Sequence, residues 1–206
     1  MWGRGRRVRA ARSFWALLLA ALIVSPPAVL AAMLLAAALH EWGHLAALRY
    51  FGAPVRALRL SAFGAVLDAP ALARLSSPRE LIVTLAGAAV NLLCAFPLAL
   101  LGARSGWEIF SLLAGAHLLL AAFNLLPILP LDGARALYLL TAYLFGLRAA
   151  RTVTAAASLA LALTVAAVGV YLSAVRRSGW LFAFAALALL WETMRQLGLA
   201  KAGKSV

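Results

Sequence analysis

Long apolar segments separated by short polar ones run through most of this chain. Segments 28–48 and 81–101 each hold 21 residues. An α-helix of that length covers about 31 Å, the thickness of the hydrocarbon core of a bilayer. The apolar segments predicted to span a membrane are 14–24, 28–48, 81–101, 109–126, 153–172 and 180–197. The pattern predicts an all-α polytopic membrane protein with about six transmembrane helices.

Polar junctions mark where these helices are expected to begin and end. Ser77–Glu80 places a serine before a proline and a glutamate three residues later, which is typical of a helix start, and Ser105–Glu108 is interpreted in the same way. Pro127 and Pro130 end the fourth span because proline cannot continue a helix. A short apolar helix is expected after them, at about 131–147.

The N-terminal segment 14–24 is short for a span. We extend it through the turn Val8–Ser13, whose arginines can reach the membrane interface with their long side chains. One integral membrane domain is expected to cover the whole chain, 1–206. It has a core at about 28–147 and peripheral helices at 1–24 and 150–199. No appended soluble domain is expected.

The composition supports a membrane location. Hydrophobic residues make up 66% of the 206 residues, the mean hydropathy is +0.98, and 12% of residues are charged. A soluble domain carries about 25% charged residues and could not bury this much apolar surface. The single cysteine, Cys94, excludes an internal disulfide and a cysteine-rich zinc site.

The positive charge indicates topology and not nucleic-acid binding. The 19 lysines and arginines, set against 6 acidic residues, lie mainly between the apolar segments and do not form one basic face. Cytoplasmic loops of membrane proteins are rich in lysine and arginine, so we expect a multi-pass protein of the cytoplasmic membrane with both termini in the cytoplasm. Arg176 and Arg177 fall on the opposite side in this topology.

One motif in the second apolar segment points to metal chemistry. Residues 40–44 read His40-Glu41-Trp42-Gly43-His44, an HExxH pattern. Positions i and i+4 share one face of a helix, so both imidazoles can bind one zinc ion. Glu41, next to His40, is then placed to deprotonate a water on the metal. Ionisable groups at membrane depth are costly and indicate function by default.

A catalytic zinc takes three protein ligands, so one more must come from elsewhere in the chain. The candidates are Asp132, His117 and the remaining glutamates. Asp132 closes the segment Asn124–Gly133, in which two prolines break the helix at membrane depth. Irregular backbone there is tolerated only where it is buried in protein or lines a wet cavity, so this segment also indicates a site.

The two motifs together resemble the site-2 protease family of intramembrane zinc metalloproteases, and in particular its short bacterial members of the sporulation-factor-processing type. The resemblance covers roughly residues 28–140. It implies that His40 and His44 are zinc ligands, that Glu41 is the general base, and that Asp132 is the third ligand. It also implies that Asn124 faces the cleft and that the substrates are transmembrane or membrane-tethered proteins.

Two weaker matches accompany these motifs. Leu58–Leu67 resembles the family's hairpin that dips back into the membrane, and its period-two pattern also favours a strand, with an ordinary cytoplasmic loop as the alternative. A strand edge there could bind an extended substrate by β-addition, and we place Phe63 and Gly64 among the cleft residues. Ala86–Asn91 resembles a third-span element of the family, in which Asn91 either lines the cleft or hydrogen-bonds between helices.

The sequence thus predicts an intramembrane zinc metalloprotease with one Zn²⁺ per chain, a short membrane-re-entrant β-hairpin and Glu41 as its base. Its expected partners are the lipid bilayer, a membrane protein substrate and a regulatory membrane protein, but no nucleic acid. The alternative is a non-proteolytic polytopic zinc-binding or transport protein. His117, two helical turns before Asn124, is either a packing residue or a residue that supports the site.

Overall fold

The computed structural model describes residues 7–53, 55, 57–61, 64–68, 77–176 and 180–199. The chain divides into two compact units, Met1–Asn124 and Leu125–Val206. Their boundary falls at the end of the fourth predicted span, just before the two prolines. The single membrane domain with a core at 28–147 stays a prediction.

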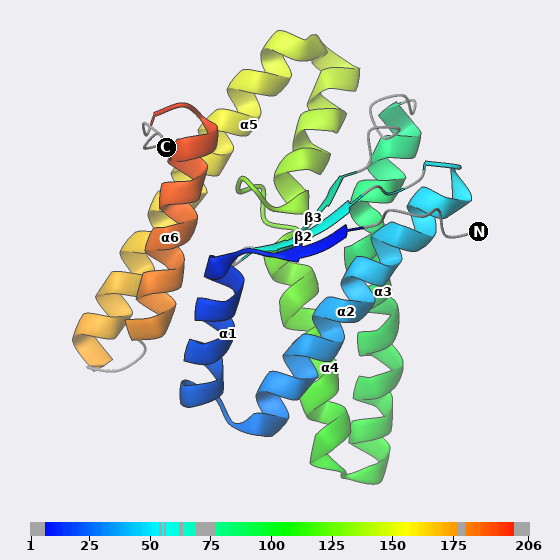
Figure 1. Cartoon of the computed structure of the whole chain (residues 1–206), viewed down its shortest axis with the longest axis vertical. Coiled ribbons are helices and arrows are strands. Elements are labelled where there is room, and N and C mark those ends of the chain that lie inside the picture. Colours follow the sequence, from blue (N-terminus) through cyan, green and yellow to red (C-terminus); the bar gives the residue numbers. More distant parts are fainter. Residues whose placement is uncertain are drawn as a thin grey trace. The chain divides into compact units, whose positions relative to one another are not determined.

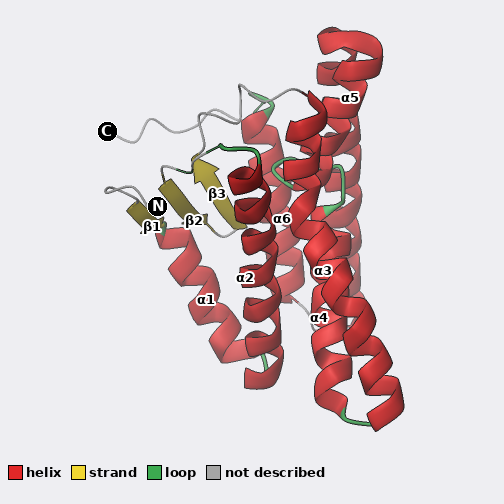
Figure 2. Ribbon diagram, turned by 90° about the vertical axis from the view of Figure 1, so that its right-hand side faces the viewer, coloured by secondary structure: helices red, strands yellow, loops and turns green. Residues whose placement is uncertain are grey.

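The first unit combines four helices with a small sheet (Figures 1 and 2). Its elements in chain order are β1 (Arg7–Ala10), α1 (Arg12–Val24), α2 (Pro27–Tyr50), β2 (Ala57–Ser61), β3 (Gly64–Asp68), α3 (Ser77–Ser105) and α4 (Glu108–Asn124). The bounds of α2, α3 and α4 agree closely with the predicted second, third and fourth spans. Helix α3 begins at Ser77, where the sequence predicts a helix start.

Helices α2, α3 and α4 pack against one another, and small side chains allow their close approach. A Cβ added to Gly43 of α2 would lie 2.6 Å from the carbonyl oxygen of Ala86 in α3, so only glycine permits this approach. Ala32 and Ala36 of α2 are buried against Ala116 of α4. Small residues are typical of helix interfaces in membranes, where lipid leaves packing as a main source of association. This packing holds the HExxH motif of α2 against α3.

The three strands form one sheet in the order β1-β2-β3. Strands β2 and β3 pair antiparallel, with Ala57 opposite Asp68 and Ser61 opposite Gly64, at the position where the sequence favours a hairpin. Its re-entry into a membrane stays a prediction. Phe63, predicted to lie in the cleft, falls outside the described residues.

Strand β1 corrects the prediction for the N-terminus. The sequence analysis placed Val8–Ser13 in a helical turn of the first span, but Arg7–Ala10 is a strand that pairs parallel with β2. Backbone groups on one edge of β1 pair with β2, in the register Arg7 to Ala57. The remaining helix α1 has 13 residues, or about 20 Å, which is shorter than a hydrocarbon core.

Three of the described helices are long and apolar enough to cross a membrane: Pro27–Tyr50, Ser77–Ser105 and Asp132–Val175. Apolar helices of 17 residues or fewer, among them Glu108–Asn124, fall below that length. The mainly helical class is thus found, together with three candidate spans. Six transmembrane helices stay a prediction.

The second unit consists of a loop, Leu125–Leu131, and the helices α5 (Asp132–Arg176) and α6 (Trp180–Gln196). Gly146 interrupts α5 with φ 84° and ψ 169°, a backbone conformation that glycine adopts without strain. The break lies close to 147, where the short helix was predicted to end. Residues 148–152, between that short helix and the predicted span 153–172, are helical, so Arg148 and Arg151 lie within the second part of α5.

Two buried hydroxyl groups anchor the loop that precedes Asp132. The backbone N–H of Leu129 donates to Ser158 Oγ (3.2 Å), and the Ser158 hydroxyl donates to the carbonyl of Pro127 (3.1 Å). Thr193 Oγ1 of α6 lies 2.6 Å from the carbonyl oxygen of Leu129 and 2.9 Å from that of Leu189, so its proton is shared between them. Helices α5 and α6 therefore both fix the irregular backbone of the loop.

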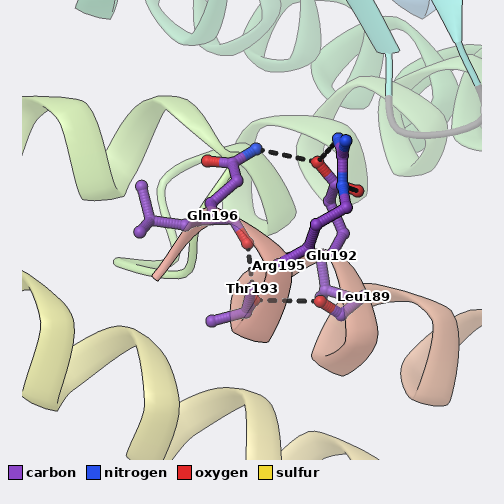
Figure 3. Close-up of polar contacts among 6 residues, drawn as sticks. Leu189, Glu192, Thr193, Arg195 and Gln196 are labelled. Atoms are coloured by element: carbon purple, nitrogen blue, oxygen red, sulfur yellow. Dashed lines mark hydrogen bonds and ion pairs between the residues drawn. The ribbon is translucent and has the colours of Figure 1, made fainter. Parts of the chain in front are cut away.

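Glu192, an acidic residue near the end of α6, is bound by its neighbours on that helix. Glu192 accepts hydrogen bonds from Arg195 Nε (2.8 Å) and from Gln196 Nε2 (3.0 Å), as Figure 3 shows beside the bond from Thr193 to Leu189. These are contacts between residues three and four apart on one helix. Glu192 thus has a structural role at the end of α6.

Replacing Thr193 by valine tests the anchor. Thr193→Val keeps the shape of the side chain but removes the hydroxyl from the buried carbonyl of Leu129, which should lower the free energy of unfolding by about 1–3 kcal/mol. The measurement is reversible unfolding in mixed detergent micelles. Thr164→Val is the matched control, because its exposed hydroxyl bonds only Ala160 within α5. Equal losses in the two variants would contradict the anchoring role.

Candidate metal centre

The two histidines of the HExxH motif lie on one face of α2 and turn their rings toward each other. Nε2 of His40 lies 3.1 Å from Nε2 of His44, and the side chains are 4% and 8% exposed. The spacing of i and i+4 explains this placement, since it puts the two side chains one turn apart. The structure therefore brings together the two residues that the sequence predicts as ligands.

A backbone group sets the orientation of His44. Its Nδ1–H donates to the carbonyl oxygen of Val83 in α3, at 2.8 Å. Because a carbonyl only accepts, the proton of the neutral ring must be on Nδ1, which leaves the Nε2 lone pair available to a metal. Fixing the second ring nitrogen in this way is typical of metal-binding histidines.

His40 is held by a side chain. Its Nδ1 lies 3.3 Å from Nδ2 of Asn91, and Oδ1 of Asn91 lies 3.0 Å from Nδ1 of His117. Asn91 is fully buried and links α2, α3 and α4 through these two contacts. Asn91 thus hydrogen-bonds between helices, which is one of the two roles that the sequence left open, and its place in the cleft stays a prediction. His117 contacts this amide on the side away from His40, so Asn91 connects the two histidines.

The spacing of the two Nε2 atoms fits a zinc ion. Tetrahedral zinc with Zn–N bonds of 2.0–2.1 Å separates two nitrogen ligands by about 3.3 Å, close to the observed 3.1 Å. Gly87 of α3 provides space beside them. A Cβ added there would overlap Nε2 of His44 and lie 2.7 Å from Nε2 of His40. Gly87 lies in the segment Ala86–Asn91, but its contact with the histidines could not be predicted because it arises only when α3 packs on α2.

Glu41 follows His40 on α2 and is half-buried. Asn124 is the last residue of α4, where its Nδ2 donates to the carbonyl of Leu120 at 3.0 Å. Gly64 begins β3 and pairs with Ser61. The role of Glu41 as base and the cleft positions of Asn124 and Gly64 stay predictions.

Asp132 belongs to the second unit and is the first residue of α5, directly after the anchored loop. The following residue must be glycine, because a Cβ at Gly133 would overlap the carbonyl groups of Leu125 and Leu126. The chain therefore folds back tightly over the start of α5. Ser158 and Thr193, which hold this loop, were not predicted, because a serine and a threonine in apolar helices carry no signal of a distant partner.

Comparison with known proteins identifies the fold. The site-2 protease from Methanocaldococcus jannaschii is similar in structure, with a TM-score of 0.68, 18% sequence identity, and coverage of 100% of this chain and 97% of that protein. No protein-family model matches the sequence, and no curated protein matches it. The chain thus has a site-2 protease-like fold.

Filling the space beside the histidines should abolish metal binding. Gly87→Ala places a methyl group where the two Nε2 atoms converge, so we expect at least a tenfold loss of zinc affinity, measured by competition with a chromophoric chelator. Gly115→Ala in α4 is the control, because no atom lies within 4 Å of its added Cβ. Zinc binding by Gly87→Ala that equals the control would show that the metal does not bind there.

Proposed function

We propose that this protein is an intramembrane zinc metalloprotease that cleaves transmembrane or membrane-tethered proteins. The observation that carries the proposal is the pair of histidines, whose Nε2 atoms converge at zinc-ligand spacing on a long apolar helix. The site-2 protease-like fold supports it, as does the glutamate beside the first histidine. An HExxH motif on a helix is typical of zinc proteases that use its glutamate as the base.

Asp132 is the proposed third ligand. His40, His44 and Asp132 each offer one ligand atom to a metal ion. Two imidazoles and one carboxylate leave the fourth position of a tetrahedral zinc open, as catalytic zinc sites require. The anchored loop before Asp132 and the tight backbone at Gly133 support a fixed position for this carboxylate within its unit. One zinc per chain is proposed.

Charge also favours this assignment. The chain has 6 acidic residues. Glu80 and Glu108 lie in the first turns of α3 and α4, where a negative charge interacts favourably with the helix dipole, and Asp68 is the last residue of β3. Glu192 is engaged at the end of α6. A Zn²⁺ ion would offset the charges of Glu41 and Asp132, which are otherwise costly in an apolar segment.

The chemistry would be divided between the metal and the protein. When bound, zinc acts as a Lewis acid that lowers the pKa of water and polarises a carbonyl. His40 and His44 hold their Nε2 lone pairs toward one point, and Asp132 contributes a carboxylate oxygen. The Glu41 carboxylate accepts a proton from the attacking water and transfers it to the nitrogen of the leaving amine.

The sheet supports a way of binding an extended substrate. Among the described strands β3 pairs only with β2, so its other edge lies at the end of the sheet. A peptide must be unwound before its carbonyl is accessible, and adding it as a strand would satisfy its backbone. We therefore propose that the substrate pairs near Gly64 and Phe63. The proposed setting is the cytoplasmic membrane, with a regulatory membrane protein as a further partner.

Glu41→Gln should separate cleavage from metal binding. The amide has nearly the shape of the carboxylate but cannot accept a proton at neutral pH, so cleavage should fall below detection while the zinc content stays near one per chain. The assay is co-expression with single-span membrane proteins, followed by detection of a new fragment. Cleavage by Glu41→Gln at the rate of the unmodified protein would remove its role as base. If a broad substrate set gave no fragment with the unmodified protein, the zinc-binding or transport alternative would be favoured.

Asp132→Ala should lower zinc affinity by at least tenfold, because it removes a charged ligand. Glu192→Ala is the control for loss of an acidic residue in the same unit, since that carboxylate is bound to Arg195 and Gln196. Metal content after dialysis against weak chelator measures both. Loss of zinc in Glu192→Ala and retention in Asp132→Ala would overturn the assignment.

A further inference from the structure

We propose that Asn91 is a positioning residue that orients His40 for metal binding, and that His117 in turn holds the amide of Asn91. The inference rests on the proposed metal site. Asn91 of α3 is 0% exposed and lies between His40 of α2, at 3.3 Å, and His117 of α4, at 3.0 Å. Each of the three packed helices therefore contributes one residue to the network.

The need for such a partner follows from the chemistry of imidazole. A neutral histidine that binds a metal through Nε2 carries its proton on Nδ1, and a buried N–H group without an acceptor is costly. For His44 the acceptor is the backbone carbonyl of Val83. For His40 the Nδ1 atom contacts the side-chain amide of Asn91, so a backbone group holds one histidine and a side chain holds the other.

An amide can serve both of its neighbours at once. Rotated so that its oxygen faces His40, the Asn91 amide accepts the Nδ1–H, and its NH₂ group donates to Nδ1 of His117. Oxygen and nitrogen exchange places in this rotation, so both contact distances are kept. His117, which is 1% exposed, thus provides the acceptor that the amide hydrogens need.

A neutral amide at position 91 also suits its apolar surroundings. A carboxylate at position 91 would accept the proton of His40 equally well, but it would add a negative charge inside apolar helices. An apolar side chain would leave the Nδ1–H of His40 without its partner. Asparagine supplies the acceptor and remains neutral.

The test compares zinc affinity in three variants of the full-length protein in detergent. Asn91→Leu keeps the branching of the side chain but removes the acceptor, and it should weaken zinc binding by about 10–100-fold, as for other residues that support metal ligands. Asn91→Asp restores the acceptor and should bind zinc within about threefold of the unmodified protein. His117→Ala leaves Asn91 in place and should give a smaller loss.

Two further measurements distinguish a role of Asn91 in orienting His40 from a purely structural role in packing the helices. The visible spectrum of bound Co²⁺ reports ligand geometry, and it should change in Asn91→Leu and be recovered in Asn91→Asp. Thr84→Val is the matched control, because Thr84 is a buried polar residue of α3 that bonds Glu80 within its own helix. Its zinc affinity and Co²⁺ spectrum should not change.

Several outcomes would overturn the inference. These are unchanged zinc affinity in Asn91→Leu, equal losses in Asn91→Leu and Asn91→Asp, or the same loss in Thr84→Val. If Asn91→Leu does not accumulate as folded protein, unchanged affinity in His117→Ala also contradicts the inference. His40→Ala tests the metal site independently. If His40→Ala binds zinc like the unmodified protein, the proposed function fails. If His40→Ala loses zinc but the Asn91 variants keep the zinc affinity of the unmodified protein, only this inference fails.

Discussion

The convergence of two imidazole rings on α2 is the interaction on which the rest of the structure depends. Histidines four residues apart share a helix face, but they present lone pairs to one point only if the other ring nitrogens are held. Here α3 holds them, through the carbonyl of Val83 and the amide of Asn91. The close approach of α3 is therefore part of the candidate metal centre, and Gly43 and Gly87 are the residues that allow it.

In the second unit, side chains of apolar helices hold an irregular stretch of backbone, the loop before Asp132. Unpaired backbone groups are costly where water is scarce, so the loop before Asp132 needs internal partners. Ser158 and Thr193 supply them. Both residues lie in segment 150–199, which the sequence assigns to the periphery, yet they hold the loop before the proposed third ligand.

Local patterns predicted much of this structure. Apolar length gave α2, α3 and α6, the proline pair gave the end of α4, and the i, i+4 spacing gave the histidine pair. Contacts between distant residues could not be predicted in the same way. Asn91 lies 51 positions from His40, and Thr193 lies 64 positions from Leu129. Strand β1 was missed because its partner β2 lies about fifty residues away, although Arg7-Val8-Arg9-Ala10 already alternates with a period of two.

The most direct test of the central claim is zinc K-edge X-ray absorption on the purified full-length protein. The account predicts two imidazole nitrogens at about 2.0–2.1 Å, with oxygen ligands completing a four-coordinate shell. In His40→Ala the signal of one imidazole should be lost. A shell without imidazole, or one that is unchanged in His40→Ala, would contradict the account.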